Sequence, residues 1–198
     1  MRRALFALGL VALIVVLVIG LRSAPRDSGP DVRSAAPSRA EIARAFADSP
    51  APLTRLHRSA NRIVPGARKE LARTLRGLRG YPVVVNLWGS WCAPCRAEFP
   101  IFQRTAVAFA KRVAFLGVLI QDKRPRAERF LREFPVTYPS IDDEHRDVSN
   151  ELRAVGVPST AFYDVRGKLA FLHQGVYRSR GDLERDISRY LGVHQALA

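Results

Sequence analysis

Cysteine is scarce in this sequence, which has two, Cys92 and Cys95, among 198 residues. Two thiols only three positions apart close a loop too short to restrict the unfolded chain, so they cannot staple a small domain together. A structural zinc site needs four ligands, and none of the four histidines has ligand-like spacing to another. The pair therefore favours thiol chemistry over a zinc site, a structural disulfide or two buried apolar side chains.

Lysine is also scarce, and the sequence has no internal repeats. Four of the 32 basic residues are lysine, the formal net charge is +14, and no period of 20–50 residues indicates a solenoid. Residues 1–80 carry 15 basic and 5 acidic side chains, against 17 and 13 in residues 81–198. No nucleic-acid-binding motif accompanies this charge, so no nucleic-acid partner is expected. The N-terminal excess indicates attraction to anionic lipid or an acidic partner, or else only an arginine-rich, well-solvated surface.

One long apolar run is present, from Ala4 to Leu21, directly after Arg2 and Arg3. As a helix it is about 27 Å long, just enough to cross a bilayer. It is longer than the apolar stretch of an ordinary signal peptide, and Arg22 disfavours cleavage after Ala24. We therefore expect an uncleaved signal anchor or transmembrane helix over residues 1–21, with a cleaved signal peptide as the alternative.

The rest of the chain divides by composition. Residues 22–48 are rich in Ser, Ala, Pro and charge and predict a flexible linker, with one or two helical turns near residues 41–46. Residues 49–80 predict a helical lead-in, with helices over 52–63 and 67–78, that packs on the domain edge or acts as a spacer. Residues 81–198 form the domain that carries the cysteines.

Alternating patterns in this domain predict an α/β fold. Strands are expected at residues 82–88, 113–120, 140–141, 160–163 and 169–173, and helices at 92–111, 125–134, 148–155 and 179–191. This order predicts a central mixed sheet, parallel in its first part, covered by helices and closed by an antiparallel hairpin.

The cysteines lie at positions i and i+3 of a predicted helix start, where their side chains share a face. Free backbone N–H groups and the helix dipole favour a thiolate there. We therefore expect Cys92 to be the exposed nucleophile and Cys95, one turn further in, to be more shielded and to resolve the mixed disulfide. Pro94 suits the first turn because that position needs no N–H donor.

The motif WCAPC at residues 91–95 resembles the thioredoxin-fold signature. The longer stretch VNLWGSWCAPCRAEFP at 85–100 resembles the TlpA/ResA/DsbE branch, whose members are membrane-anchored extracytoplasmic thiol–disulfide oxidoreductases, and GVPST at 156–160 is similar to that branch's second signature. The resemblance covers residues 81–191. It implies a thioredoxin-like fold over residues 81–198, with a strand–helix insert near residues 122–141.

The resemblance also implies roles for particular residues. Cys92 and Cys95 form the redox disulfide, and Val157–Pro158 is a cis peptide facing it rather than an ordinary trans bond. The backbone of Val157 then pairs with a bound substrate strand. Pro158 counts among the catalytic residues in this scheme.

Three further positions follow from the same resemblance. Glu98 takes part in proton transfer at Cys95, unless it is only a solvated helix carboxylate. Trp91 contacts substrate and shields the disulfide, whereas Trp88 fits the core as well as the site. The chain departs from plain thioredoxin at Asn86, where that protein has a buried aspartate, so a proton acceptor is missing there.

These observations predict a membrane-tethered enzyme with its redox domain outside the cytoplasm, without metal or other cofactor. Its expected partners are protein thiols or disulfides and a separate membrane electron donor or acceptor. Arginines flank the apolar run on both sides and so orient it only weakly in the membrane. The expectation that the redox domain lies outside the cytoplasm therefore rests on the cysteine pair. The direction stays open between a reductant, for example in cytochrome c maturation, and an oxidant that forms envelope disulfides.

A binding protein is the alternative function: a metal- or haem-handling protein that uses the thioredoxin fold without redox turnover. Copper chaperones of this fold usually separate their cysteines by three residues, and this chain would need His145 or His173 as a distal ligand. A peroxidase fits less well, since its nucleophile does not sit in a two-cysteine pair.

Overall fold

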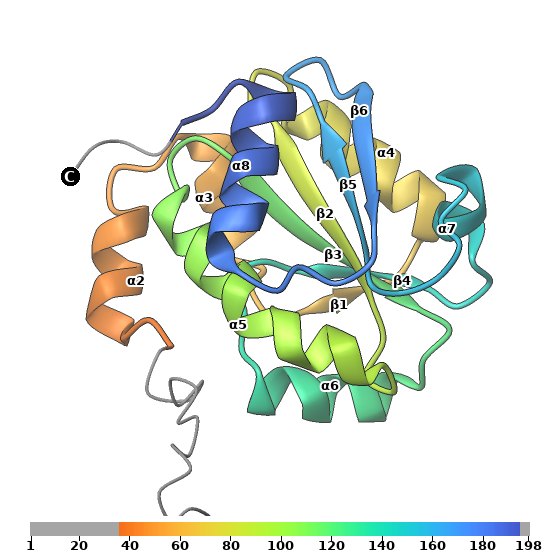
Figure 1. Cartoon of the computed structure of the whole chain (residues 1–198). Helices are drawn as coiled ribbons and strands as arrows, with labels where there is room; N and C mark the ends of the chain where they lie inside the picture. The colour runs from red at the N-terminus through yellow and green to blue at the C-terminus, as the bar shows by residue number, and fades with distance from the viewer. Residues whose placement is uncertain (1–35, 195–198) are drawn as a thin grey trace, which may run out of the picture. The chain divides into compact units, whose positions relative to one another are not determined.

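The computed structural model describes residues 36–194 (Figure 1). Its helices are α2 (Arg39–Phe46), α3 (Ala51–His57), α4 (Ala67–Gly77), α5 (Ala93–Ala108), α6 (Arg124–Glu133), α7 (Asp147–Glu151) and α8 (Arg180–Leu191). Its strands are β1 (Ile63–Val64), β2 (Val83–Trp88), β3 (Ala114–Ile120), β4 (Ser140–Asp143), β5 (Ser159–Tyr163) and β6 (Leu169–Gln174). The expected membrane anchor at residues 1–21 lies outside the described residues. Within residues 36–194, no helix is both long and apolar enough to span a bilayer.

The strands form one mixed sheet in the order β1-β4-β3-β2-β5-β6. The first four run parallel, whereas β5 pairs antiparallel with β2 and β6 antiparallel with β5. Parallel neighbours need crossover connections, and helices supply them: α5 joins β2 to β3, and α6 joins β3 to β4. The sheet therefore places the start of α5 at the carboxyl end of β2.

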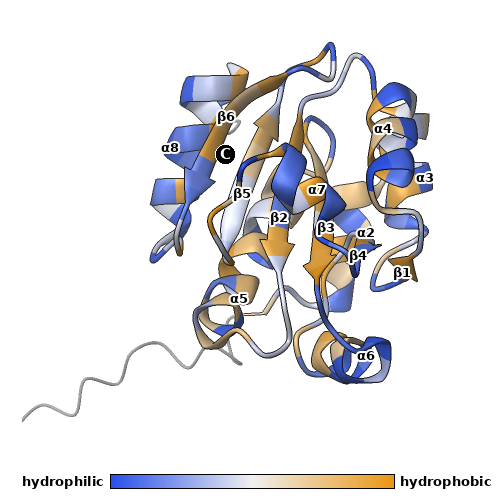
Figure 2. Cartoon of the chain, turned by 90° about the vertical axis from the view of Figure 1, so that its right-hand side faces the viewer, coloured by the Kyte–Doolittle hydropathy of each residue, from blue (hydrophilic) through white to orange (hydrophobic). Residues whose placement is uncertain are grey.

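Two apolar clusters lie on opposite faces of the sheet, which runs between the helices in Figure 2. Alternate β2 residues point to each side, so Val84 and Trp88 face α5, α6 and α8, while Val83, Val85 and Leu87 face α3, α4 and α7. Each β2 residue is buried, as expected of a central strand covered on both faces.

Most of the predicted elements are confirmed, with end shifts of a few residues. The helix predicted over residues 52–63 is wrong in its second half, because α3 ends at His57. Asn61 then adopts a positive φ of 59°, and its side-chain oxygen accepts the backbone N–H of Val136 at 2.8 Å. Ile63 and Val64 therefore form β1, which pairs with Ser140–Ile141, and the helical spacing of the apolar residues did not reveal this pairing.

The helical lead-in shares the core of the cysteine-bearing part. Leu53 of α3, Leu71 of α4 and Leu78 are buried in the same cluster as the central strands. The edge strand β1 extends the sheet beyond β4. Burial of these side chains stabilises both parts together, so the lead-in is a structural part of this fold and not a free spacer.

Candidate active site

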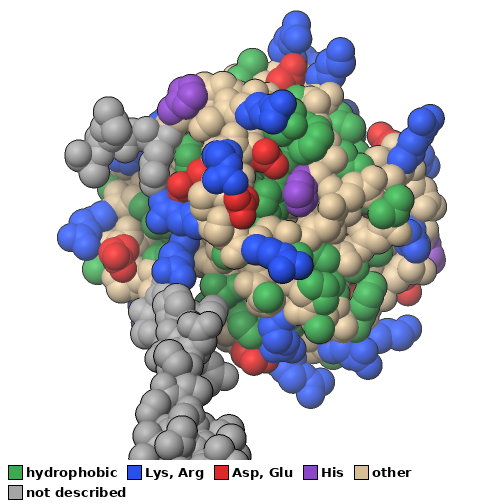
Figure 3. Space-filling view, viewed as in Figure 1, with side chains coloured by type: hydrophobic (Ala, Val, Ile, Leu, Met, Phe, Trp, Pro, Cys, Tyr) green, Lys and Arg blue, Asp and Glu red, His purple; other side chains and the backbone are tan. Residues whose placement is uncertain are grey.

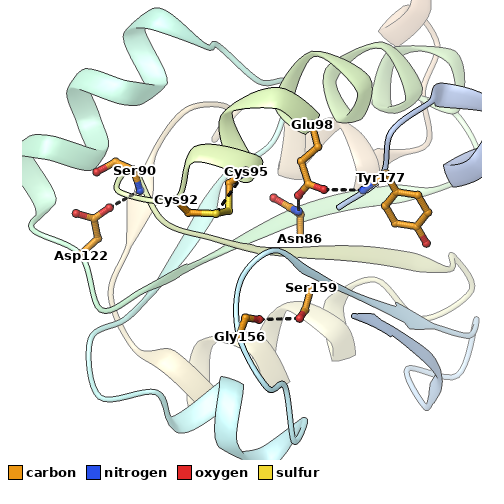
Figure 4. The surroundings of a disulfide bond; sticks show 9 residues. All are labelled: Asn86, Ser90, Cys92, Cys95, Glu98, Asp122, Gly156, Ser159 and Tyr177. Atoms are coloured by element: carbon orange, nitrogen blue, oxygen red, sulfur yellow. Dashed lines mark hydrogen bonds between the residues drawn. A yellow bond between two sulfur atoms is a disulfide. The ribbon is translucent and has the colours of Figure 1, made fainter. Parts of the chain in front are cut away.

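The disulfide between Cys92 and Cys95 lies at the first turn of α5 (Figure 4). Cys92 is the N-cap residue, and its Sγ accepts the backbone N–H of Cys95 at 3.1 Å. Pro94 occupies the first turn, where a missing N–H costs nothing. The same N–H and the helix dipole would favour a thiolate on Cys92 in the reduced protein.

The expected exposure of Cys92 is wrong in this oxidised state. Cys92 is 4% exposed and Cys95 is 0% exposed. Cys92 is drawn inward because its sulfur is bonded to a fully buried partner, and both residues belong to the core cluster on the α5 face. The order of shielding is as predicted, with Cys95 the deeper of the two.

The loop that leads into Cys92 is held by a residue from the neighbouring strand connection. Asp122, which follows β3, accepts the backbone N–H of Ser90 at 2.5 Å and that of Lys123 at 2.7 Å. The adjacent Trp91 is 51% exposed, and its indole lies so close to Gly89 that a Cβ there would come within 2.7 Å of Nε1. The absence of a side chain at Gly89 therefore leaves room for the Trp91 ring, and the hydrogen bond to Asp122 fixes the backbone at Ser90.

Glu98 is fully buried one turn beyond Cys95, so it is not a solvated helix carboxylate. Its Oε1 accepts a hydrogen bond from Nδ2 of Asn86 at 2.7 Å, and its Oε2 accepts one from the backbone N–H of Tyr177 at 3.1 Å (Figure 4). Burial raises the pKa of Glu98 to about 7, although both hydrogen bonds lower it. A carboxyl group with this pKa can accept and release a proton near neutral pH.

Asn86 explains how a titrating carboxyl group is tolerated in the core. An aspartate at this position would place a second negative charge beside Glu98 and oppose its ionisation. An amide has both a donor and an acceptor, so it can donate to a carboxylate or, after rotation of the amide, accept from a carboxylic acid. In the structure Nδ2 faces Glu98, and Oδ1 is buried without a hydrogen-bond partner among the described residues. A carboxyl group is therefore present beside position 86, but it comes from Glu98 of α5 and not from β2.

Tyr177 belongs to the segment between β6 and α8, far from Glu98 in sequence. Its hydroxyl donates to Oδ2 of Asp186 at 2.6 Å, and its ring stacks on His173 with centroids 4.2 Å apart. Burial, followed by the hydrogen bond to Asp186, raises the pKa of Tyr177. These contacts hold the Tyr177 amide where it donates to Glu98.

The Val157–Pro158 bond is cis, as predicted, and Pro158 is buried. It directly precedes β5, whose first residue, Ser159, lies opposite Leu87 of β2. Because β2 leads through the loop to Cys92, the cis-proline segment and the disulfide lie at the same end of the sheet. The roles predicted for Trp91, Val157 and Pro158 in substrate contact stay predictions.

Sequence reasoning missed Asp122 and Tyr177. A signal existed for Asp122, since it follows a buried strand parallel to β2 and the ends of parallel neighbours meet at one edge of the sheet. No local signal marks Tyr177, because its contribution is a backbone N–H. Trp88, expected to fit core or site, is fully buried and donates from Nε1 to Ser140 at 3.1 Å. Within residues 36–194, no three His, Cys, Asp or Glu side chains gather in a way that could hold a metal ion.

The fold and this site define a thioredoxin-fold protein with a two-cysteine redox centre. The family model described as AhpC/TSA family matches residues 65–172, more than half of the chain. The chain belongs to this family.

Among curated relatives, the chain is similar to the thiol:disulfide interchange protein DsbE of Pseudomonas fluorescens biotype C, with 32% identity over 114 residues, covering 57% of this chain and 62% of that protein. It is also similar to the thiol-disulfide oxidoreductase ResA of Geobacillus kaustophilus, with 29% identity, covering 57% and 65%. The chain thus spans less than two thirds of the length of these relatives.

Among solved structures, MTB DsbF, in mixed oxidised and reduced forms, matches with a TM-score of 0.54 and 28% identity, covering 58% of this chain and 84% of that one. A DsbF homologue from Corynebacterium diphtheriae matches with a TM-score of 0.52 and 28% identity, covering 58% and 75%. These matches agree with the predicted fold and with the predicted resemblance to the DsbE/ResA branch.

Proposed function

We propose that this chain is a thiol–disulfide oxidoreductase that exchanges disulfides with partner proteins through Cys92 and Cys95. The observation that carries the proposal is a disulfide at the N-terminus of α5 with a buried carboxyl group, Glu98, one turn away. The names of the DsbE and ResA relatives support the same reaction class.

In the reductive direction, the thiolate of Cys92 attacks one sulfur of a substrate disulfide. A new bond forms between Cys92 and that sulfur, and the second substrate sulfur leaves as a thiolate. The Cys95 thiol then loses its proton and attacks Cys92 Sγ, which breaks the mixed disulfide and releases the first substrate sulfur. Two electrons pass to the substrate, and the protein is left with the disulfide seen here.

Glu98 receives the proton that Cys95 must lose in this scheme. Because its pKa is raised to about 7, both the protonated and the ionised form of Glu98 are populated at neutral pH. Asn86 can pair with either form. In the oxidative direction the same steps run in reverse, and Glu98 returns the proton to Cys95. Thiol–disulfide exchange transfers electrons between sulfur atoms, and the reaction requires no cofactor.

We also propose that residues 1–21 anchor the protein in the cell membrane with the redox domain on the extracytoplasmic side. The apolar run from Ala4 to Leu21 supports this, as does a disulfide-forming pair that suits an oxidising compartment. A separate membrane protein then supplies or removes electrons. If the protein reduces, its substrates are disulfides such as those between the haem-attachment cysteines of c-type apocytochromes, which it converts to free thiols. If it oxidises, its substrates are the thiols of envelope proteins.

The first test replaces each cysteine in turn. We expect Cys92→Ala to lower reduction of a neutral peptide disulfide to the uncatalysed background, because no nucleophile remains. We expect Cys95→Ala to attack but to accumulate the mixed disulfide, which mass spectrometry detects. Unchanged exchange by Cys92→Ala would refute the proposed reaction.

The direction and the location need separate measurements. A reduction potential of about −270 mV for the Cys92/Cys95 couple supports a reductant, and one of about −120 mV supports an oxidant. For location, the full chain and a variant lacking residues 1–21 are compared by membrane fractionation and by protease access from the outer side. Retention of the shortened variant in the membrane fraction would contradict the anchor.

A further inference from the structure

A groove of about 890 Å³ lies between β1 and α6, separate from the residues of the redox centre. Its walls come from two segments far apart in the sequence, residues 59–65 and 124–135. Its accessible apolar lining comes from Val64, which is half-buried, and from Pro65 and Pro135, which are exposed. Ile63 and Leu131 also belong to the lining but are buried core residues. The volume is far more than one small anion occupies, so the groove suits a chain segment.

The charge of this groove is strongly one-sided. Arg62, Arg124 and Arg132 line it, against one acidic residue, Glu128. Arg124 is already engaged, because its Nε donates to Glu128 at 3.0 Å and its Nη2 donates to the carbonyl of Ile63 at 2.9 Å. These bonds join β1 to α6 and satisfy a carbonyl group at the edge of the sheet.

Arg62 and Arg132 are exposed, and within residues 36–194 neither guanidinium forms an ion pair with a carboxylate. They belong to different walls, one to the segment before β1 and one to α6. A segment with several carboxylates can pair with both guanidinium groups at once. In Figure 3, Lys and Arg side chains gather along the lower edge of the face shown, where Figure 1 places α6.

The groove is linked to the disulfide helix through α6. Glu133, next to Arg132, pairs with Arg96 at 3.0 Å, and Arg96 directly follows Cys95. The guanidinium of Arg96 also lies over the rings of Phe130 and Phe134, 5.1 and 4.9 Å from their centroids. The end of α6 thus packs against the first turns of α5, the helix that begins at the redox pair. This connection favours a protein substrate of the cysteines as the occupant over a lipid.

We propose that this groove is a docking site for an acidic, flexible segment of a protein partner in thiol–disulfide exchange. The proposal rests on the function proposed above and adds the chemistry of the partner. Arg62 and Arg132 bind the carboxylates, and the apolar lining contacts the segment's backbone and side-chain stems. Binding there raises the local concentration of the partner's sulfur at the redox centre.

The test measures the rate at which the reduced full chain opens two peptide disulfides that differ only in a tail. Both have a neutral loop closed by a disulfide and a spacer of about eight residues, which reaches at most about 26–29 Å. One tail is a run of glutamates, and the other is the same run of glutamines. We expect the glutamate peptide to react about tenfold faster at an ionic strength of about 0.01 M and the difference to vanish near 1 M.

The variant Arg62→Glu/Arg132→Glu is expected to remove the advantage of the glutamate peptide and to leave the glutamine peptide unchanged. The control, Arg76→Glu/Arg79→Glu, changes the net charge equally at exposed positions outside the groove. It should retain most of the advantage. Equal effects of the two variants would overturn the proposal, since the attraction would then come from the charge of the whole molecule.

Three other results would separate a failure of the docking site from a failure of the redox function. Equal rates for the two peptides with the parent chain would overturn the docking site while leaving the redox function intact. Failure with both peptides would count against the redox function itself. If the parent shows no preference for the glutamate tail, but Arg62→Glu/Arg132→Glu weakens its binding to vesicles containing phosphatidylglycerol, the groove binds lipid and the proposal is wrong.

Discussion

Glu98 is a residue whose ionisation depends on where the fold places it. A glutamate in water ionises near pH 4.5, whereas this one lies in the core, where Asn86 and the Tyr177 amide donate hydrogen bonds to it. Burial opposes the charged form more than two hydrogen bonds favour it, so the pKa rises to about 7. The residue therefore affects both the chemistry of Cys95 and the stability of the fold.

The stability of the oxidised protein should depend on pH through this residue. Between about pH 4.5 and 7 the folded state holds a proton on Glu98 that the unfolded state has released, so the free energy of unfolding falls as pH rises. The total loss is about 3 kcal/mol, and it is complete above about pH 7. Urea unfolding across this range measures the slope.

Glu98→Gln should lose this pH-dependent contribution while remaining folded, because glutamine is neutral and can still pair with Asn86 and the Tyr177 amide. Its exchange rate should also lose the rise through about pH 7 that deprotonation of Glu98 gives the parent. An unchanged slope in Glu98→Gln would show that another group titrates in this window.

At the scale of elements, β3 and β4 must approach closely beside Trp88. Gly117 of β3 lies opposite Ser140 of β4, and the Trp88 indole donates to the Ser140 hydroxyl at 3.1 Å. A Cβ at Gly117 would overlap that hydroxyl and come within 2.9 Å of the indole nitrogen. A glycine is needed here for space, and its φ is not in the left-handed region.

Gly117→Ala should therefore lower the free energy of unfolding by about 1–3 kcal/mol, because the overlap must displace packed side chains and disturb the Trp88 hydrogen bond. The matched control is Gly77→Ala at the end of α4, where an added Cβ meets nothing within 4 Å. That change should be neutral or slightly stabilising. Denaturant unfolding of both variants measures the difference, and equal stabilities would contradict the close packing.

On the scale of the whole molecule, the lead-in helices and the redox part share a core, so we expect them to unfold as one unit. Leu53 of α3 is 3% exposed and belongs to the cluster that contains β2 and β3 side chains. The structure also shows where part of the excess positive charge lies, since Arg62 and Arg132 line the groove beside α6. Some of that charge is thus gathered around one concave site.

Leu53→Ala should lower the free energy of unfolding of the whole protein by about 2–5 kcal/mol, because it leaves a cavity in a shared core. Tryptophan fluorescence reports the redox part and circular dichroism reports all helices, so the two transitions should coincide. Arg58→Ala, at an exposed position nearby, is the control and should have little effect. Separate transitions would show that the lead-in folds independently.

The sequence by itself determined the central strands, the position of the disulfide helix and the reactive pair. These features depend on local patterns: continuous apolar runs, an i, i+3 spacing of cysteines, and capping residues such as Ser179 and Gly192 at the ends of α8. The family resemblance added the cis bond before Pro158 and the choice of Glu98.

Only the tertiary structure decided the rest, because it depends on groups brought together from distant parts of the chain. The two-residue strand β1 exists through its pairing with β4, which no periodicity can show. The pKa of Glu98 follows from its burial, from an amide on β2 and from a backbone N–H 79 residues away. The arginine groove likewise forms only because β1 and α6 lie side by side. The sequence therefore showed the excess of arginine but not where the arginines gather.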